Sequence, residues 1–236
     1  MPEKTPPEFT YTPLTGPYQF SCLQCGKCCT IRMLSLTPYD VWEACQHDIH
    51  MELAPSHFTS QYCIIDLNQA TPQVFLQGIN DKCPFLKMDD KGQSECLIYT
   101  HRFHICRTYP IKQEVKFKAA KQQQISRTPK SITYSISRKC DGVGIGSSTS
   151  IRPEGIFQSI DAKETLEYQY LLSVFSRVGL FNIPIVKEAW FALFYNPDLQ
   201  GFYNIEMTWN DYKKIVKEKL VEIYEEETNQ KWEEIP

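Results

Sequence analysis

The sequence has no apolar run that approaches the roughly 18 residues of a membrane span,. Its first twenty residues are rich in proline and lack the apolar segment of a secretory signal peptide,. We therefore expect a cytoplasmic protein. In that reducing compartment, clustered cysteines favour metal or redox chemistry over disulfides.

Several signatures of catalysis and binding are also missing. We find no Ser-His-Asp signature, no phosphate-binding loop and no His-Glu-x-x-His run,. The net charge is −3, which gives no overall attraction to nucleic acid or to an anionic membrane,. Eight basic residues lie between positions 112 and 139, and we interpret them as a solvated face. Nucleic acid is therefore not expected as a partner, and a protein partner stays open.

Cysteine, in contrast, is abundant and clustered. Four of the 10 cysteines lie within eight residues, in Cys22-x-x-Cys25-Gly26-Lys27-Cys28-Cys29. Such a run lets one loop wrap a metal centre, and Gly26 supports the close backbone approach that this requires. The spacing matches the first part of the bacterial ferredoxin run, although zinc uses paired Cys-x-x-Cys as well. It favours an iron–sulfur cluster slightly over zinc.

Cys28 and Cys29 are adjacent, which restricts how they can share one metal. Side chains of neighbouring residues point away from each other in extended backbone. We therefore hypothesise that Cys29 serves a second site, or a second position in an enlarged cluster.

Four further cysteines follow singly. Cys83, Cys96 and Cys106 stand beside proline, glycine and aromatic residues, and we predict that they are ligands. Cys140 precedes several glycines that we interpret as a flexible turn. Up to two four-thiolate sites are possible, and spacing does not divide the cysteines between them. The remaining two, Cys45 and Cys63, lie in apolar segments and are predicted core residues.

The pattern of elements predicts an α+β fold, with an irregular, metal-organised cysteine domain of short strands followed by a three-helix subdomain. We predict an extended arm at 1–17, a cysteine-cluster domain at 18–146, a linker at 147–150 and a helical region at 151–236. In the first half we expect a helix at 38–50 that begins with Thr37-Pro38. We expect extended pieces at 62–67, 73–76, 83–86 and 95–99. We also expect strands at 115–117 and 131–137, joined by a solvated connection at 118–130.

Beyond residue 150 the apolar period becomes helical. This region contains no cysteine, so we expect it to cover the first half and to supply no ligands. Three helices are predicted. The first begins with a capping box at Asp161-x-x-Glu164 and ends at Gly179. The second begins at Pro184 and ends at Asn196-Pro197, and the third begins at Thr208-x-x-Asp211.

Three other residues lie beside the cysteines. Arg107 could lower the pKa of the neighbouring Cys106 thiol, or it could form a surface ion pair. His101 and His104 could ligate zinc. With eight cysteines available, we expect these histidines to be polar loop residues.

The chain carries, in order, Phe20-x-Cys22-x-x-Cys25-Gly26-x-Cys28-Cys29, Cys83-Pro84-Phe85-Leu86, Cys96-x-Ile98-Tyr99-x-x-Arg102 and Cys106-Arg107-x-x-Pro110. This order resembles the YkgJ-like cysteine-cluster family over roughly residues 18–146. Its members are described as zinc- or iron-chelating proteins, and the domain also occurs in flagellin lysine N-methylases. Phe103 and Tyr109 depart from the family pattern, which has Pro and Phe there. The resemblance implies one ligand set: Cys22, Cys25, Cys28, Cys29, Cys83, Cys96, Cys106 and Cys140.

Two functional hypotheses follow from a metal at this site. The first is a metal-dependent enzyme, either redox or methyl-transferring by analogy with the flagellin methylases, although no S-adenosylmethionine loop is recognisable. The second is a zinc-stabilised, non-catalytic binding or assembly module that uses the basic strand segment or the acidic C-terminal tail. The sequence leaves the choice between enzyme and module open.

Overall fold

The structure is a computed structural model that describes residues 11–30, 33–47, 54–80, 82–90, 94–119, 125–145, 151–204 and 206–232. Helices and three small antiparallel sheets make up these residues, as the predicted α+β class requires. Within them, none of the helices combines the length and the apolar character that crossing a bilayer demands. The predicted linker at 147–150 lies outside the described residues.

A small sheet and two helices form the part of the fold next to the cysteine loop. Its strands are β2 (Met33–Ser35), β4 (Gln73–Gln77) and β3 (Cys63–Asp66), in the order β2-β4-β3. The predicted helix at 38–50 is α1 (Pro38–His47), and the predicted position Ile49 lies outside the described residues. Helix α2 (Pro55–Tyr62) was not predicted and runs directly into β3.

A long hairpin forms the second sheet, in the order β1-β8-β7. Strands β7 (Ile111–Ala119) and β8 (Ile125–Ser137) extend through most of the predicted solvated connection, so that prediction was wrong, and β1 (Tyr11–Pro13) pairs with the end of β8. Arg127 and Lys130 are exposed on β8. These polar side chains therefore belong to a strand with one face in solvent. The backbone hydrogen bonds between the two strands do not depend on which side chains that face carries.

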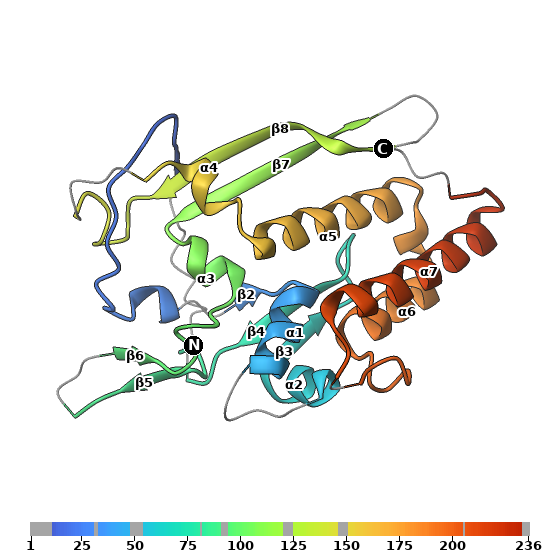
Figure 1. Cartoon of the computed structure of the whole chain (residues 1–236), viewed down its shortest axis with the longest axis horizontal. Coiled ribbons are helices and arrows are strands. Elements are labelled where there is room, and N and C mark those ends of the chain that lie inside the picture. Colours follow the sequence, from blue (N-terminus) through green and yellow to red (C-terminus); the bar gives the residue numbers. More distant parts are fainter. Residues whose placement is uncertain are drawn as a thin grey trace, which may run out of the picture.

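A third, two-stranded sheet carries part of the cysteine cluster. Strands β5 (Leu86–Met88) and β6 (Ser94–Cys96) pair with Leu86 opposite Cys96, close to the two predicted arms. The short helix α3 (His104–Thr108) follows and was not predicted. Figure 1 shows this hairpin, α3 and the N-terminal segment grouped at one end of the molecule.

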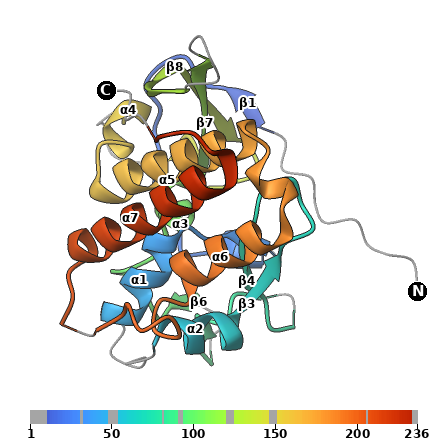
Figure 2. The ribbon, with the colours of Figure 1, turned by 90° about the vertical axis from the view of Figure 1, so that its right-hand side faces the viewer.

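The three predicted C-terminal helices are present as α5 (Ile160–Arg177), α6 (Pro184–Tyr195) and α7 (Trp209–Thr228). A short helix α4 (Pro153–Ile156) and a 3₁₀ turn at Leu180–Asn182 precede and follow α5. Helix α5 lies between the β7–β8 hairpin on one side and α6 and α7 on the other (Figures 1 and 2).

The helix ends agree with most of the predicted caps. Thr208 caps α7 by accepting a hydrogen bond from the Asp211 amide at 3.2 Å. For α5 the predicted capping box was wrong, since Ser159 is the cap and accepts from the Ala162 amide. Asp161 is instead buried in the first turn of α5, where it has another role described below.

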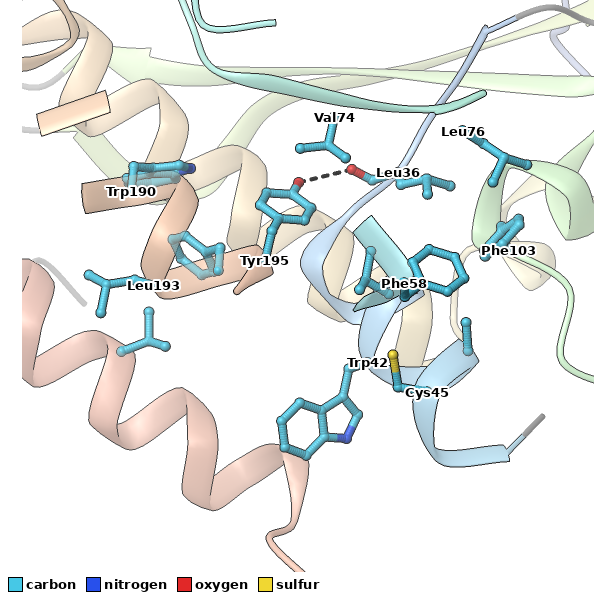
Figure 3. Packing of buried hydrophobic residues seen from close by; sticks show 14 of the residues in the cluster. Leu36, Trp42, Cys45, Phe58, Val74, Leu76, Phe103, Trp190, Leu193 and Tyr195 are labelled. Carbon is cyan, nitrogen blue, oxygen red and sulfur yellow. Dashed lines mark hydrogen bonds between the residues drawn. The ribbon is translucent and has the colours of Figure 1, made fainter. Parts of the chain in front are cut away.

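One hydrophobic core combines both halves of the chain. Phe175 and Trp190 are fully buried in it, and Trp42 of α1 stacks on Tyr212 of α7 at 5.0 Å. Figure 3 shows Cys45 inside this core, as predicted. Among the described residues, none of the eight predicted ligands belongs to its buried members. The buried core is therefore built from residues other than the predicted ligands, although Cys83, Cys96 and Cys106 pack against it. The division into arm, cysteine domain and helical region stays a prediction.

Asp40 joins this core to the cysteine region. It is 3 % exposed, and one carboxylate oxygen accepts hydrogen bonds from the amide and hydroxyl of Thr37. Its other oxygen accepts the amide of His104 at 2.6 Å, at the start of α3. One buried carboxylate thus satisfies the beginnings of two helices, and the second of these carries Cys106.

We expect Asp40→Ala to lower the free energy of unfolding by about 2–4 kcal/mol, because it leaves buried donors without an acceptor. Asp90→Ala, at an exposed turn, is the matched control and should change it by less than about 0.5 kcal/mol. Urea unfolding followed by circular dichroism measures both. Equal losses in the two variants would contradict the role given to Asp40.

Candidate metal centre

One cavity of about 320 Å³ is lined by all the cysteines that the sequence singles out as ligands. The N-terminal loop, the β5–β6 hairpin, α3 and the segment after β8 each contribute to its wall. Cys45 and Cys63 are not part of the lining. The cysteines that do line it are Cys22, Cys25, Cys28, Cys29, Cys83, Cys96, Cys106 and Cys140.

The N-terminal loop turns sharply at Gly26, whose φ is +69°. This is the left-handed region, which favours glycine, and a Cβ there would lie 3.1 Å from Ser94,. The Ser94 hydroxyl donates to the carbonyl of Gln24, which fastens the loop to β6. As the sequence indicated, glycine lets the loop approach its neighbour closely.

Cys28 and Cys29 lie in a short 3₁₀ helix, η1 (Lys27–Thr30), and their sulfur atoms are 3.9 Å apart. The sequence argument assumed extended backbone, in which adjacent side chains diverge, and that assumption was wrong. Tetrahedral zinc with bonds of about 2.3 Å has sulfurs about 3.8 Å apart, so these two thiols are spaced as ligands of one metal would be. Whether Cys29 serves a second site stays a prediction.

The β5–β6 hairpin holds Cys83 and Cys96 at the cavity wall. The Cys83 amide donates to the Cys29 carbonyl at 2.7 Å, which joins the hairpin to η1. Burial raises the pKa of Cys83 to about 11 and also raises that of Cys96. The amides of Phe85 and Ile98, each two residues further along, hydrogen bond to these sulfurs and act on the pKa in the opposite direction,.

Cys106 is placed by the two ends of α3. Burial, and then the charges of neighbouring thiolates, raise its pKa. Asp40 holds the start of the helix, and Arg107 pairs with Asp161 of α5 at 2.8 Å. Of the two roles that the sequence allowed for Arg107, the structure thus has the ion pair. It is partly buried and ties the cysteine region to the C-terminal helices.

Cys140 is brought to the cavity by a close backbone contact. The Ser21 amide donates to the Gly142 carbonyl at 3.1 Å, and the Gly144 amide to the Gln19 carbonyl at 2.9 Å. A Cβ on Gly142 would lie only 2.1 Å from the Ser21 carbonyl oxygen. The glycines therefore form a fixed contact, which differs from the flexible turn expected from the sequence.

Charges around the cavity are nearly balanced. Lys27 forms an ion pair with Asp141, as Arg107 does with Asp161. Arg102, which the sequence analysis quoted in a motif without giving it a role, lies 4.1 Å from the Tyr99 ring centroid. Its Nε donates to the Tyr99 carbonyl at 3.1 Å, and it has no carboxylate partner among the described residues. The sequence signal for this contact was the spacing, because Arg102 follows Tyr99 by three residues.

The sulfur atoms surround the cavity without converging on one point. Among the described residues, no three His, Cys, Asp or Glu side chains are positioned to hold one metal ion. Neither His101 nor His104 lines the cavity, and His104 is buried at the start of α3. The donors on the cavity wall are thus mainly thiols, together with the Asp141 carboxylate. Thiols suit soft metals such as zinc and iron in iron–sulfur clusters. The donor chemistry fits such a metal, although the sulfurs must move inward to hold it.

Gly142→Ala should force Ser21 and Gly142 apart and lower the free energy of unfolding by about 1–3 kcal/mol, because the new Cβ has no space. It should also lower metal content, since Cys140 moves with this segment. Gly155→Ala is the control, because a Cβ there meets nothing within 4 Å. Thermal unfolding and elemental analysis test both variants, and unchanged metal and stability in Gly142→Ala would refute the close contact.

Part of the chain matches the model of a known protein family. Residues 21–128 match the model of a family entitled CxxCxxCC, with the description "Putative zinc- or iron-chelating domain". This is the cysteine-cluster family that the motif order predicted. Neither a curated protein nor a solved structure matches the chain.

Proposed function

We propose that this chain, whose residues 21–128 form a domain of the CxxCxxCC family, holds zinc or an iron–sulfur cluster in the eight-cysteine cavity and uses that metal in a reaction. The observation that carries the proposal is the shared cavity. Eight cysteines from four separate segments line it, and the two cysteines assigned to the core by sequence do not. The ligand set proposed is Cys22, Cys25, Cys28, Cys29, Cys83, Cys96, Cys106 and Cys140.

Burial keeps the thiols of the cavity neutral until a cation is present. It raises the pKa of Cys83 to about 11 and also raises that of Cys106, which opposes the thiolate form. A positive ion favours the thiolate form, which is the form that binds metals. Thiolates select soft metals, and this supports zinc and iron–sulfur alike.

Two features support a role in chemistry over a purely structural role. The hydrophobic core is large and has no metal ligand among its buried members, so the fold does not need the metal as its main support,. The cavity is also open to solvent, since Cys22 and Cys25 are exposed and apolar Leu23 and Tyr99 on its wall are 47 % and 43 % exposed. A molecule from solution can therefore reach the sulfurs.

Redox chemistry is the version we propose first. An iron–sulfur cluster supplies one-electron transfer, and zinc supplies a Lewis acid. Methyl transfer stays outside the proposal because it rests on shared domain membership alone. The second candidate is a zinc-stabilised binding or assembly module, which the exposed apolar side chains Leu23, Leu97, Tyr99 and Ile105 around the cysteine segments favour.

Anaerobically purified protein should contain zinc or iron in stoichiometric amount. Cys28→Ser should lose at least half of this metal, because Cys28 interacts with most of the other thiols of the cavity. Cys45→Ser should keep all of it. Elemental analysis gives metal content, and a brown colour with iron identifies a cluster. A full complement of metal in Cys28→Ser would contradict the ligand set, and colourless protein with zinc would remove the redox version.

Removing the metal separates the two candidate functions. We expect chelation to leave the helical circular dichroism signal of the full chain largely intact and unfolding cooperative, because the core of α1, α5, α6 and α7 contains none of the proposed ligands. Loss of most of the helical signal on chelation, with recovery when zinc is returned, would instead identify a metal-stabilised module.

A further inference from the structure

We infer that the cysteines form two sets within the cavity, an inner set of Cys28, Cys83, Cys96 and Cys106 that binds one metal, and an outer set of Cys22, Cys25 and Cys140 that binds a second, more exchangeable one. Cys29 lies beside Cys28 where the two sets meet. This inference rests on the proposed function and deepens it, because it assigns the ligands to two sites.

Packing is the first support for the two sets. Cys83, Cys96 and Cys106 contact the hydrophobic core. Cys22 and Cys25, in contrast, are exposed. Three of the inner thiols therefore stand on the core side of the cavity and two of the outer ones on its solvent side, while Cys28 and Cys140 are both half-buried and are assigned by the backbone contacts below. A metal held by the inner set would be shielded from chelators by the core and by the outer loop.

The backbone holds each set together by its own contacts. For the inner set, the Cys83 amide bonds to the Cys29 carbonyl beside Cys28. Cys96 stands opposite Leu86 in the β5–β6 hairpin. The Phe85 ring packs against Phe103, just before α3, at 5.9 Å. These contacts bring the hairpin, η1 and α3, which carry the four inner cysteines, to one side of the cavity.

The outer set is held by a different group of contacts. Phe20 and Val143 form an antiparallel bridge, which aligns the residues before Cys22 with those after Cys140. The ion pair between Lys27 and Asp141 joins the loop of Cys25 to the same segment. Two contacts also link the outer set to the inner one, because Lys27 belongs to η1 and the Ser94 hydroxyl of β6 donates to the Gln24 carbonyl. The outer set is set apart by its exposure to solvent at Cys22 and Cys25.

Arg102 is a fixed cation on the inner side. It lines the cavity and lies on the chain segment between Cys96 and Cys106, which both belong to the inner set. The guanidinium is held by the Tyr99 ring and carbonyl, and no carboxylate among the described residues neutralises it. It can therefore offset the negative charge that an inner thiolate site carries, which stabilises a metal there more than one in the outer set.

Zinc titration and release test the two sets in the full, reduced chain. The wild type should bind two zinc ions and release them to a chromogenic chelator in two phases, the fast one at least about tenfold faster than the slow one. Cys25→Ser should lose the fast phase and keep the slow one, and Cys106→Ser should do the reverse. Cys22→Ser and Cys96→Ser form a second outer and inner pair if Cys106→Ser fails to fold. Cys45→Ser should keep both phases.

The charge of Arg102 gives an independent readout. Arg102→Gln should weaken the binding of the slowly released zinc about five- to tenfold and leave the binding of the other zinc unchanged. Arg102→Lys should bind both zinc ions with affinities close to those of the wild type. Arg138→Gln, an exposed arginine outside the cavity lining, is the control.

The outcomes separate this inference from the proposed function. A single release phase, or the same phase lost by Cys25→Ser and Cys106→Ser, would overturn the two sets while leaving a metal centre in the cavity. Wild-type protein that binds neither zinc nor iron would overturn both proposals.

Discussion

The arrangement of the cysteine cavity depends on two buried carboxylates that lie outside the cysteine motifs. Asp40 accepts the amide at the start of α3, and Asp161 pairs with Arg107 near its end. A helix of five residues is too short to be stable on its own in water. These two contacts therefore determine where α3 lies, and with it the position of Cys106 on the cavity wall.

The same contacts explain why a helical region without cysteines accompanies a cysteine domain. Helix α5 supplies Asp161, and α6 and α7 complete the core against which α1 packs. Tyr195 of α6 donates its hydroxyl to the carbonyl of Leu36, just before α1 (Figure 3). The helices thus support the cavity from behind, and most of the packing that holds the chain together lies outside the cavity.

Much of this could be predicted from the sequence where the signal is local. Thr37 and Thr208 cap their helices, as the residues that follow each of them predicted. Gly26 lies at a turn with positive φ, a conformation that favours glycine. The apolar segments around Cys45 and Cys63 placed these two cysteines in the core. The full set of eight came from the resemblance to the cysteine-cluster family, because local context left Cys140 open.

The rest could not be predicted because it depends on partners distant in sequence. Asp161 looked like a helix cap, and only the folded chain shows that its partner is Arg107, 54 residues earlier. The first part of β8, residues 125–130, was missed because its polar side chains suggested a loop, whereas pairing with β7 determines its conformation. Spacing likewise did not divide the thiols, because that division depends on which ones face the core.

The ion pair between Arg107 and Asp161 also bears on the order in which the protein is made. Asp161 follows all ten cysteines in the sequence, so a growing chain emerges from the ribosome with its thiols before the residue that holds α3. At about 5–20 residues per second, the ribosome needs seconds to add α5. During that interval all ten cysteines have been synthesised while the partner that holds α3 through Arg107 is still missing.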